Sequence, residues 1–147
     1  MTKEVLVSVC GIQYQNGEAD KTETITIGNY YKKNNCHYLF YEEVMEGFST
    51  PVKNMIKFSQ GQLSVQKKGV VISNMIFEER KKNLSNYVTP YGDIMIGIDA
   101  KSVELQESEQ QIQVRVEYAM EINYEHLADC SLTIDIKEKR EGISFSL

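Results

Sequence analysis

The segment from Ile112 to Tyr124 constrains the fold most, because apolar and polar residues alternate through its thirteen positions. An alternation of period two predicts a β-strand with one buried face. A strand inside a parallel sheet would be apolar on both faces, so this segment belongs to an antiparallel sheet or barrel. We predict that one register faces the interior, and its members are Ile112, Val114, Val116, Tyr118, Met120, Ile122 and Tyr124.

Similar segments recur at short intervals, and turn-forming residues separate them. The strands predicted from period-two patterning are 3–14, 21–31, 37–42, 52–59, 63–66, 70–77, 83–88, 93–104, 112–124 and 129–137. In the second segment Ile25 and Ile27 share a face, and we assign the opposite, threonine-bearing face to solvent. Lys67-Lys68-Gly69 predicts a three-residue hairpin loop. Thr89-Pro90-Tyr91-Gly92 predicts a turn in which Gly92 has either positive φ or a backbone contact that excludes a Cβ.

No amphipathic helix accompanies these strands, so the chain is predicted to be an all-β meander. A sheet of roughly ten strands twists until it closes or splits. We therefore predict that residues 1–147 form a single domain, a closed antiparallel up-and-down β-barrel, and the alternative is a β-sandwich.

Composition excludes several classes of function. The net charge of −5 and the scattered bases argue against a nucleic-acid partner, and no segment is long enough to span a membrane. Cys10, Cys36 and Cys130 are few, odd in number and far apart, which favours reduced thiols in the cytoplasm. The N-terminal apolar stretch is too short for a signal peptide. His37 and His126 lie 89 positions apart, and no second ligand stands at metal-binding spacing, so we expect no metal and no cofactor.

Aromatic and charged side chains supply the candidate binding residues, which are Tyr38, Tyr41, Glu42, Glu43, Tyr91, Arg115 and Tyr118. Inward side chains of a barrel this size either fill the lumen or line a ligand cavity. Tyrosine rings provide wide apolar contact and their hydroxyls provide orientation, which suits a small apolar or aromatic ligand. The sequence leaves other possibilities open: structural tyrosines in a filled barrel that acts as a protein-interaction or regulatory module, or an enzyme for a small aromatic acid. We assign no catalytic residue, and we expect a monomer or homodimer.

Parity refines these candidates. Tyr38 and Tyr41 lie an odd number of positions apart, so a regular strand points them to opposite faces, and we predict that Tyr41 is the inward one. We place Tyr91 in a loop beside the barrel mouth. Arg115 lies on the polar face of its strand and therefore outside the barrel. Phe145 and Leu147 alternate at the end of the chain and could pack on a barrel edge or a neighbouring molecule; disorder is the equal alternative.

The order of several pieces resembles a known family. These pieces are the Tyr38-Leu39-Phe40-Tyr41-Glu42-Glu43 strand, the Val65-Gln66-Lys67-Lys68-Gly69 hairpin, the Thr89-Pro90-Tyr91-Gly92 turn, Lys101 and the Tyr118 strand. Over nearly the whole chain they resemble the YwiB-like family, called domain of unknown function 1934. The resemblance implies a calycin, that is, a lipocalin-like closed barrel, and implies no established activity. That family usually has Arg where Lys67 stands, so a role that needs a bidentate guanidinium does not carry over.

Overall fold

Ten antiparallel strands make up the computed structural model, which describes residues 3–139 and contains no helix in that range. The strands are β1 (Lys3–Gln15), β2 (Glu18–Lys33), β3 (Cys36–Glu43), β4 (Val52–Ser59), β5 (Gln62–Lys68), β6 (Ser73–Glu78), β7 (Lys81–Thr89), β8 (Gly92–Glu107), β9 (Gln111–Ile122) and β10 (Glu125–Glu138). They pair in the order β6-β5-β4-β3-β2-β1-β10-β9-β8-β7, so sequence neighbours are sheet neighbours except β6 and β7, and β1 also pairs with β10. The predicted antiparallel up-and-down barrel is confirmed. The part of the chain that the structure describes has no helix that is long and apolar enough to cross a membrane.

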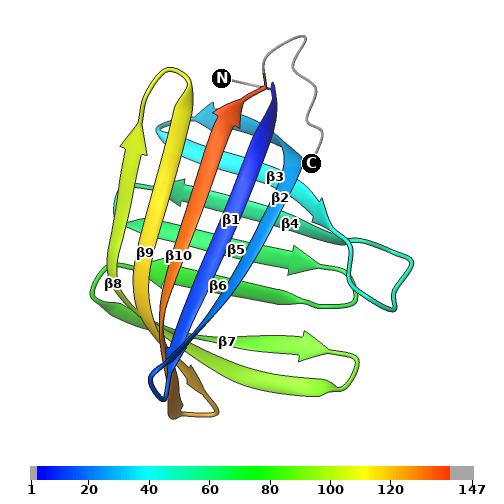
Figure 1. Ribbon diagram of the computed structural model, residues 1–147, viewed down its shortest axis with the longest axis vertical. Coiled ribbons are helices and arrows are strands. Elements are labelled where there is room, and N and C mark those ends of the chain that lie inside the picture. Colours follow the sequence, from blue (N-terminus) through cyan, green and yellow to red (C-terminus); the bar gives the residue numbers. More distant parts are fainter. Residues whose placement is uncertain (1–2, 140–147) are drawn as a thin grey trace.

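The sheet folds over on itself into two crossing layers. Strands β3 to β6 run across the molecule behind the more upright β1, β2, β9 and β10 (Figure 1). The interior between the layers is packed with apolar side chains, and those with no or almost no exposed surface include Val7, Leu39, Ile56, Val116 and Ile134. Their burial supplies the main force that closes the sheet.

Closure of the barrel is nearly complete, and the incomplete seam lies between β6 and β7. One isolated bridge joins Ile72 to Val88, with N–O distances of 3.0 and 2.9 Å between their backbone groups. Elsewhere along the seam, the Asn83 side chain donates to the Ile76 carbonyl at 3.4 Å and to Glu78 at 3.3 Å. A side-chain amide thus satisfies a carbonyl that a continuous ladder would otherwise pair.

A second opening lies between β2 and β3. These strands pair only where residues 29–33 of β2 meet residues 36–40 of β3. Over residues 18–28 of β2, the edge away from β1 has no paired strand among the described residues. The two strands therefore diverge over the part of β2 that precedes Asn29, and the barrel wall has a gap there.

The alternation in β9 has the predicted orientation up to Ile122. Ile112, Val114 and Val116 are buried, whereas Arg115 is exposed and pairs with Glu117 at 3.2 Å on the outer face. The prediction that Tyr124, the last member of this register, faces the interior was wrong. Asn123 and Tyr124 have φ of 50° and 71° and form the two-residue turn into β10, so the Tyr124 side chain is exposed.

The predicted orientation of β2 was also wrong. Thr26 and Gly28 stand directly opposite Val7 and Val5 in the β1–β2 ladder. Directly opposite residues share a face, and both valines are fully buried, so the threonine face points inward. Ile25 consequently lies on the outer face with 44% of its surface exposed. Residue type alone predicted the reverse orientation. It is the pairing of β2 with β1 that decides which face of β2 lies inside.

Turn chemistry agrees with most of the predicted connections. Gly92 has φ of 134°, as predicted for the Thr-Pro-Tyr-Gly turn. The predicted loop at Lys67-Lys68-Gly69 is shifted: both lysines belong to β5, and the connection runs from Gly69, at φ 152°, to Ile72. The connection between the predicted strands 70–77 and 83–88 is shorter than predicted, because β6 ends at Glu78 and β7 begins at Lys81, which leaves a two-residue turn. Phe145 and Leu147 lie outside the described residues.

Candidate functional site

A row of polar side chains crosses the inner face of the barrel beside the gap between β2 and β3. In consecutive ladders Tyr41 stands opposite Asn54, Asn54 opposite Lys67, and Lys67 opposite Ser73. Tyr41, Asn54 and Ser73 are buried, so the row faces inward. We call these four residues, one each from β3, β4, β5 and β6, the polar row.

Glu43 joins the polar row through hydrogen bonds. It lies two positions after Tyr41, on the same face of β3. The Lys67 ammonium donates to Glu43 Oε1 at 2.9 Å and to Asn54 Oδ1 at 2.8 Å. Asn54 Nδ2 donates to Glu43 Oε1 at 3.4 Å. The Lys67 and Glu43 side chains keep 18% and 31% of their surface exposed, so solvent and small molecules can reach this ion pair.

Ser73 differs from the other residues of the polar row because its hydroxyl has no hydrogen-bond partner in the described chain. Its Oγ is buried, and no group of the described chain forms a hydrogen bond with it. A buried hydroxyl without a partner costs about 1–3 kcal/mol. A partner from outside the chain, either a water molecule or a ligand, would remove that cost.

Two tyrosines, Tyr41 and Tyr87, add hydroxyl groups to the site. Burial, reinforced by the negative charge of Glu43, raises the pKa of the Tyr41 hydroxyl to about 12. The same two causes raise the pKa of Tyr87, an inward residue of β7 that packs against the core. Both hydroxyls are therefore protonated at neutral pH and can donate hydrogen bonds to an acceptor.

A cavity of 530 Å³ opens where β2 and β3 diverge. Its lining comes from β2, β3 and β4 and consists of Thr26, Ile27, Asn29, Phe40, Tyr41, Glu42, Lys53 and Asn54. Two of these residues, Tyr41 and Asn54, belong to the polar row. The cavity therefore connects the outside of the barrel with the row, and its volume lies in the range of small-molecule sites.

The lumen beyond the polar row is filled. The next cross-strand row consists of Leu39, Ile56, Val65 and Met75, all buried or packed against the core. The following row consists of His37, Phe58, Leu63 and Phe77, all nearly fully buried. A molecule that enters through the gap meets the polar row first and a close-packed apolar floor behind it.

The predicted site residues separate into different places. Tyr41 points inward as predicted, and Tyr38 points outward, where its ring stacks on Tyr31 at 4.8 Å. Tyr118 lies inside, deeper than the row, with its ring edge-on to Phe77 at 4.9 Å and its hydroxyl hydrogen-bonded with the Cys130 thiol. Burial is the main cause that raises the pKa of Tyr118. Binding by any of these residues stays a prediction.

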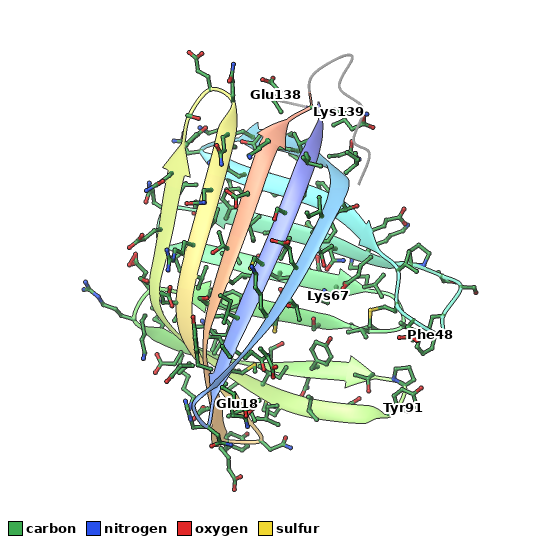
Figure 2. The ribbon with its side chains drawn as sticks, viewed as in Figure 1. Glu18, Phe48, Lys67, Tyr91, Glu138 and Lys139 are labelled. Carbon is green, nitrogen blue, oxygen red and sulfur yellow. The ribbon has the colours of Figure 1, made fainter. Side chains whose placement is uncertain are left out.

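Tyr91 lies apart from the polar row. It occupies the tip of the β7–β8 hairpin with 91% of its surface exposed. Figure 2 shows Tyr91 and Phe48 on loops at the same side of the molecule, with Lys67 farther in. Of the other candidates, Glu43 joins the row, Glu42 lines the cavity, and Arg115 lies outside the barrel.

Sequence reasoning missed Asn54, Lys67, Ser73 and Tyr87 as site residues. Asn54 offered a signal, because it interrupts the otherwise apolar inward register Val52, Ile56 and Phe58 of β4. A polar residue at a buried position of a strand has to find partners, and such residues often mark function. The remaining three could not be connected with Asn54 before the ladder registers were known.

A second buried polar group lies two rows away from the polar row. His37 Nδ1 is 2.6 Å from the Tyr30 hydroxyl, and its ring stacks on Phe58 at 4.6 Å. His37 Nε2 is 3.6 Å from Glu107, which also pairs with Lys32 at 3.1 Å. Burial lowers the pKa of His37, the Glu107 charge opposes that shift, and Lys32 adds to it.

Comparison with known proteins gives one family and one relative. The family model described as "Domain of unknown function (DUF1934)" matches residues 7–134. An uncharacterized beta-barrel protein YwiB from Bacillus subtilis (strain 168) is 27% identical over 134 residues, which cover 89% of this chain and 92% of the relative. The crystal structure of ywiB protein from Bacillus subtilis superposes with a TM-score of 0.83 and 23% identity, covering 94% of this chain and 93% of that one. The structural likeness shows a shared fold.

Proposed function

The chain belongs to the family described as domain of unknown function 1934, and on that premise we propose that it binds a small, partly apolar molecule at the gap in its barrel wall. The polar row holds the polar end of that molecule, and the cavity between β2 and β3 receives its apolar body. This role agrees with the resemblance to lipocalin-like (calycin) barrels, in which small molecules enter at the mouth. The free thiols of Cys10, Cys36 and Cys130 suit a reducing compartment, and we place the protein in the cytoplasm.

One observation supports the proposal most strongly. The polar row, with one residue from each of four strands, interrupts an apolar lumen at the place where the barrel wall is open. Folding gains little from such a row, because the cost of removing the Lys67–Glu43 ion pair from water can exceed the attraction between the two charges. The unpartnered Ser73 hydroxyl adds to that cost. Natural proteins keep such locally unfavourable groups mainly where function requires them.

The donors in the row indicate the chemistry of the ligand. Lysine has three N–H donors, and Lys67 directs two of them to Glu43 and Asn54, which leaves one for a ligand. The protonated Tyr41 hydroxyl and the Ser73 hydroxyl can donate as well. We therefore expect a ligand with an acceptor oxygen, such as a carboxylate or carbonyl group, on an apolar or aromatic body that packs on the rings of Tyr41 and Phe40.

A titration with fatty acids, phenolic acids and fluorescent apolar probes tests this function. We expect saturable binding by wild type and binding weaker by about tenfold or more in Lys67→Met, because a hydrogen bond to a charged group is lost. Lys68→Met is the matched control, since Lys68 is the exposed neighbour on the same strand. Tyr41→Phe and the outward Tyr38→Phe form a second matched pair. Absence of saturable binding by wild type, or equal affinities within each pair, contradicts the proposal.

A further inference from the structure

The edge of β2 that faces the gap in the barrel wall carries unpaired backbone groups. Asn16 and Gly17, with φ of 52° and 77°, form the two-residue turn from β1 into β2. In a β-turn the N–H of the fourth residue donates to the first, so Glu18 is hydrogen-bonded to β1. Bonding alternates along an antiparallel strand, so the even-numbered residues of β2 bond to β1 and the odd-numbered residues face the other edge. From residue 19 to residue 25 no described strand or other backbone group pairs with that edge.

This free edge is open to solvent. Residues 18–25 are exposed on both faces of β2, and Figure 2 places Glu18 at the end of the molecule opposite Glu138. Lys21 and Glu23 share the outer face, and neither forms an ion pair within the described part of the chain. Ile25 follows on the same face with 44% of its surface exposed. A long, exposed and unpaired strand edge is a template for pairing with another strand.

The free edge is complementary to itself in one antiparallel register. A twofold axis through Thr22 places Lys21 of each copy directly opposite Glu23 of the other. Opposite charges that face each other across two strands attract, and the symmetry provides this pair twice. The same axis places Ala19 opposite Ile25 of the second copy. All four residues direct their backbone groups to the free edge, so the register forms about eight backbone hydrogen bonds.

Neighbouring registers are less favourable. An axis at Lys21 or at Glu23 would place that residue opposite its own copy, and like charges directly opposite each other are destabilising. An axis at Thr24 would place both charged residues opposite isoleucines. An axis midway between two residues would place an edge-facing residue opposite one that is bonded to β1, so the backbone hydrogen bonds could not form. Charge and backbone bonding therefore favour the same axis, at Thr22.

We propose that two copies of this chain associate through the free edge of β2, antiparallel about a twofold axis at Thr22. The pairing joins the two barrels through one continuous sheet and gives the open edge its missing hydrogen bonds. In this register Glu18 of the second copy stands opposite Thr26, which lines the 530 Å³ cavity. The second copy thus extends the wall beside the gap. A role of that extension in binding rests on the proposed ligand-binding function; the dimer itself does not.

Sedimentation of the full chain without any ligand tests the dimer. We expect wild type to form dimers in a concentration-dependent equilibrium. Lys21→Glu and Glu23→Lys should each raise the dissociation constant at least about tenfold, because each substitution replaces two attractive pairs with two repulsive ones. The double variant, Lys21→Glu with Glu23→Lys, restores both pairs, so its dissociation constant should return to within about threefold of the wild-type value.

The matched control lies on a strand with two partners. Arg115 and Glu117 have the same spacing on the outer face of β9, which pairs with both β8 and β10. Arg115→Glu should leave the dissociation constant of the dimer unchanged. Thermal melting verifies that each variant is folded.

Hydrogen exchange locates the interface. The Lys21 and Glu23 amides face the free edge, so they should exchange at least about tenfold more slowly in concentrated than in dilute protein. A wild-type chain that stays monomeric at about 1 mM, where even a weak complex would form, overturns the proposal. A dimer that neither single charge reversal weakens, or that the double variant does not restore, overturns it as well.

Discussion

His37 is a buried residue whose protonation the fold opposes. The Tyr30 hydroxyl lies against its Nδ1, and Phe58 covers one face of its ring. Burial lowers the pKa of His37 from its ordinary value of 6.5 more than the Glu107 charge raises it. Below pH 6.5 the imidazole of His37 binds a proton more readily in the unfolded chain than in the folded one. The free energy of unfolding therefore falls as pH falls toward the folded-state pKa.

We therefore predict that His37→Gln weakens the pH dependence of stability. Between about pH 8 and about pH 5.5, wild type should lose more unfolding free energy than the variant, because the variant has no imidazole to protonate at this site. Urea unfolding at both pH values measures the two losses. Equal losses would show that His37 titrates alike in the folded and unfolded chain.

Val116 tests the register of β9 at a single residue. Its side chain is fully buried between β8 and β10. Val116→Asp would bury an unpaired carboxylate, and we expect a loss of several kcal/mol, on the order of the whole stability of a domain. Glu117→Gln, on the outer face, should change the unfolding free energy by about 0.5 kcal/mol or less. Thermal melting of both variants gives the comparison, and a wild-type melting temperature for Val116→Asp would contradict the register.

At the scale of the elements, the turn at Gly92 depends on backbone conformation. Gly92 has φ of 134°, and a Cβ built there has no heavy atom within 4 Å, so steric contact with other residues is not the constraint. We predict that Gly92→Ala costs about 1–3 kcal/mol, because side chains disfavour this φ. Gly11→Ala is the control, since Gly11 has ordinary strand φ and its Cβ would meet only Thr22 Oγ1 at 3.4 Å. Chemical denaturation should separate the two variants; equal stabilities would mean that the turn tolerates a side chain.

The strands themselves differ in how many partners hold them. β9 is paired along most of its length with both β8 and β10. β2 has β1 on one side and only five residues of pairing with β3 on the other. The cavity and the polar row lie beside the part of β2 that has no second partner, so the weakest part of the wall and the candidate site coincide.

At the scale of the whole molecule, the β6–β7 seam is where the barrel should open first. One bridge between Ile72 and Val88 replaces a continuous ladder there. We predict that the Val88 amide exchanges with deuterated solvent at least about tenfold faster than the Val114 amide in β9, because opening the seam breaks fewer hydrogen bonds. Native-state hydrogen exchange measures both rates. Similar protection of the two amides would indicate that the seam is as stable as the central ladders.

Several features of the protein could be predicted from local patterns. The period-two alternation of Ile112 to Ile122 predicts a strand with one buried face, and the Thr-Pro-Tyr-Gly turn predicts positive φ at Gly92, because both depend on a few adjacent residues. Parity alone predicts that Tyr38 and Tyr41 point to opposite faces. Many strands without helices predict an antiparallel barrel for the same reason, since each hairpin is a local structure.

Only the tertiary structure decided which face of β2 lies inside and which side chains meet. The inward face of β2 follows from its pairing with Val5 and Val7, which no pattern within β2 specifies. The polar row depends on three ladder registers that bring Tyr41, Asn54, Lys67 and Ser73 together from four strands. Side-chain alternation is a property of one strand, whereas register and closure are properties of strand pairs and of the whole sheet, so the sequence pattern determines the first and long-range pairing determines the others.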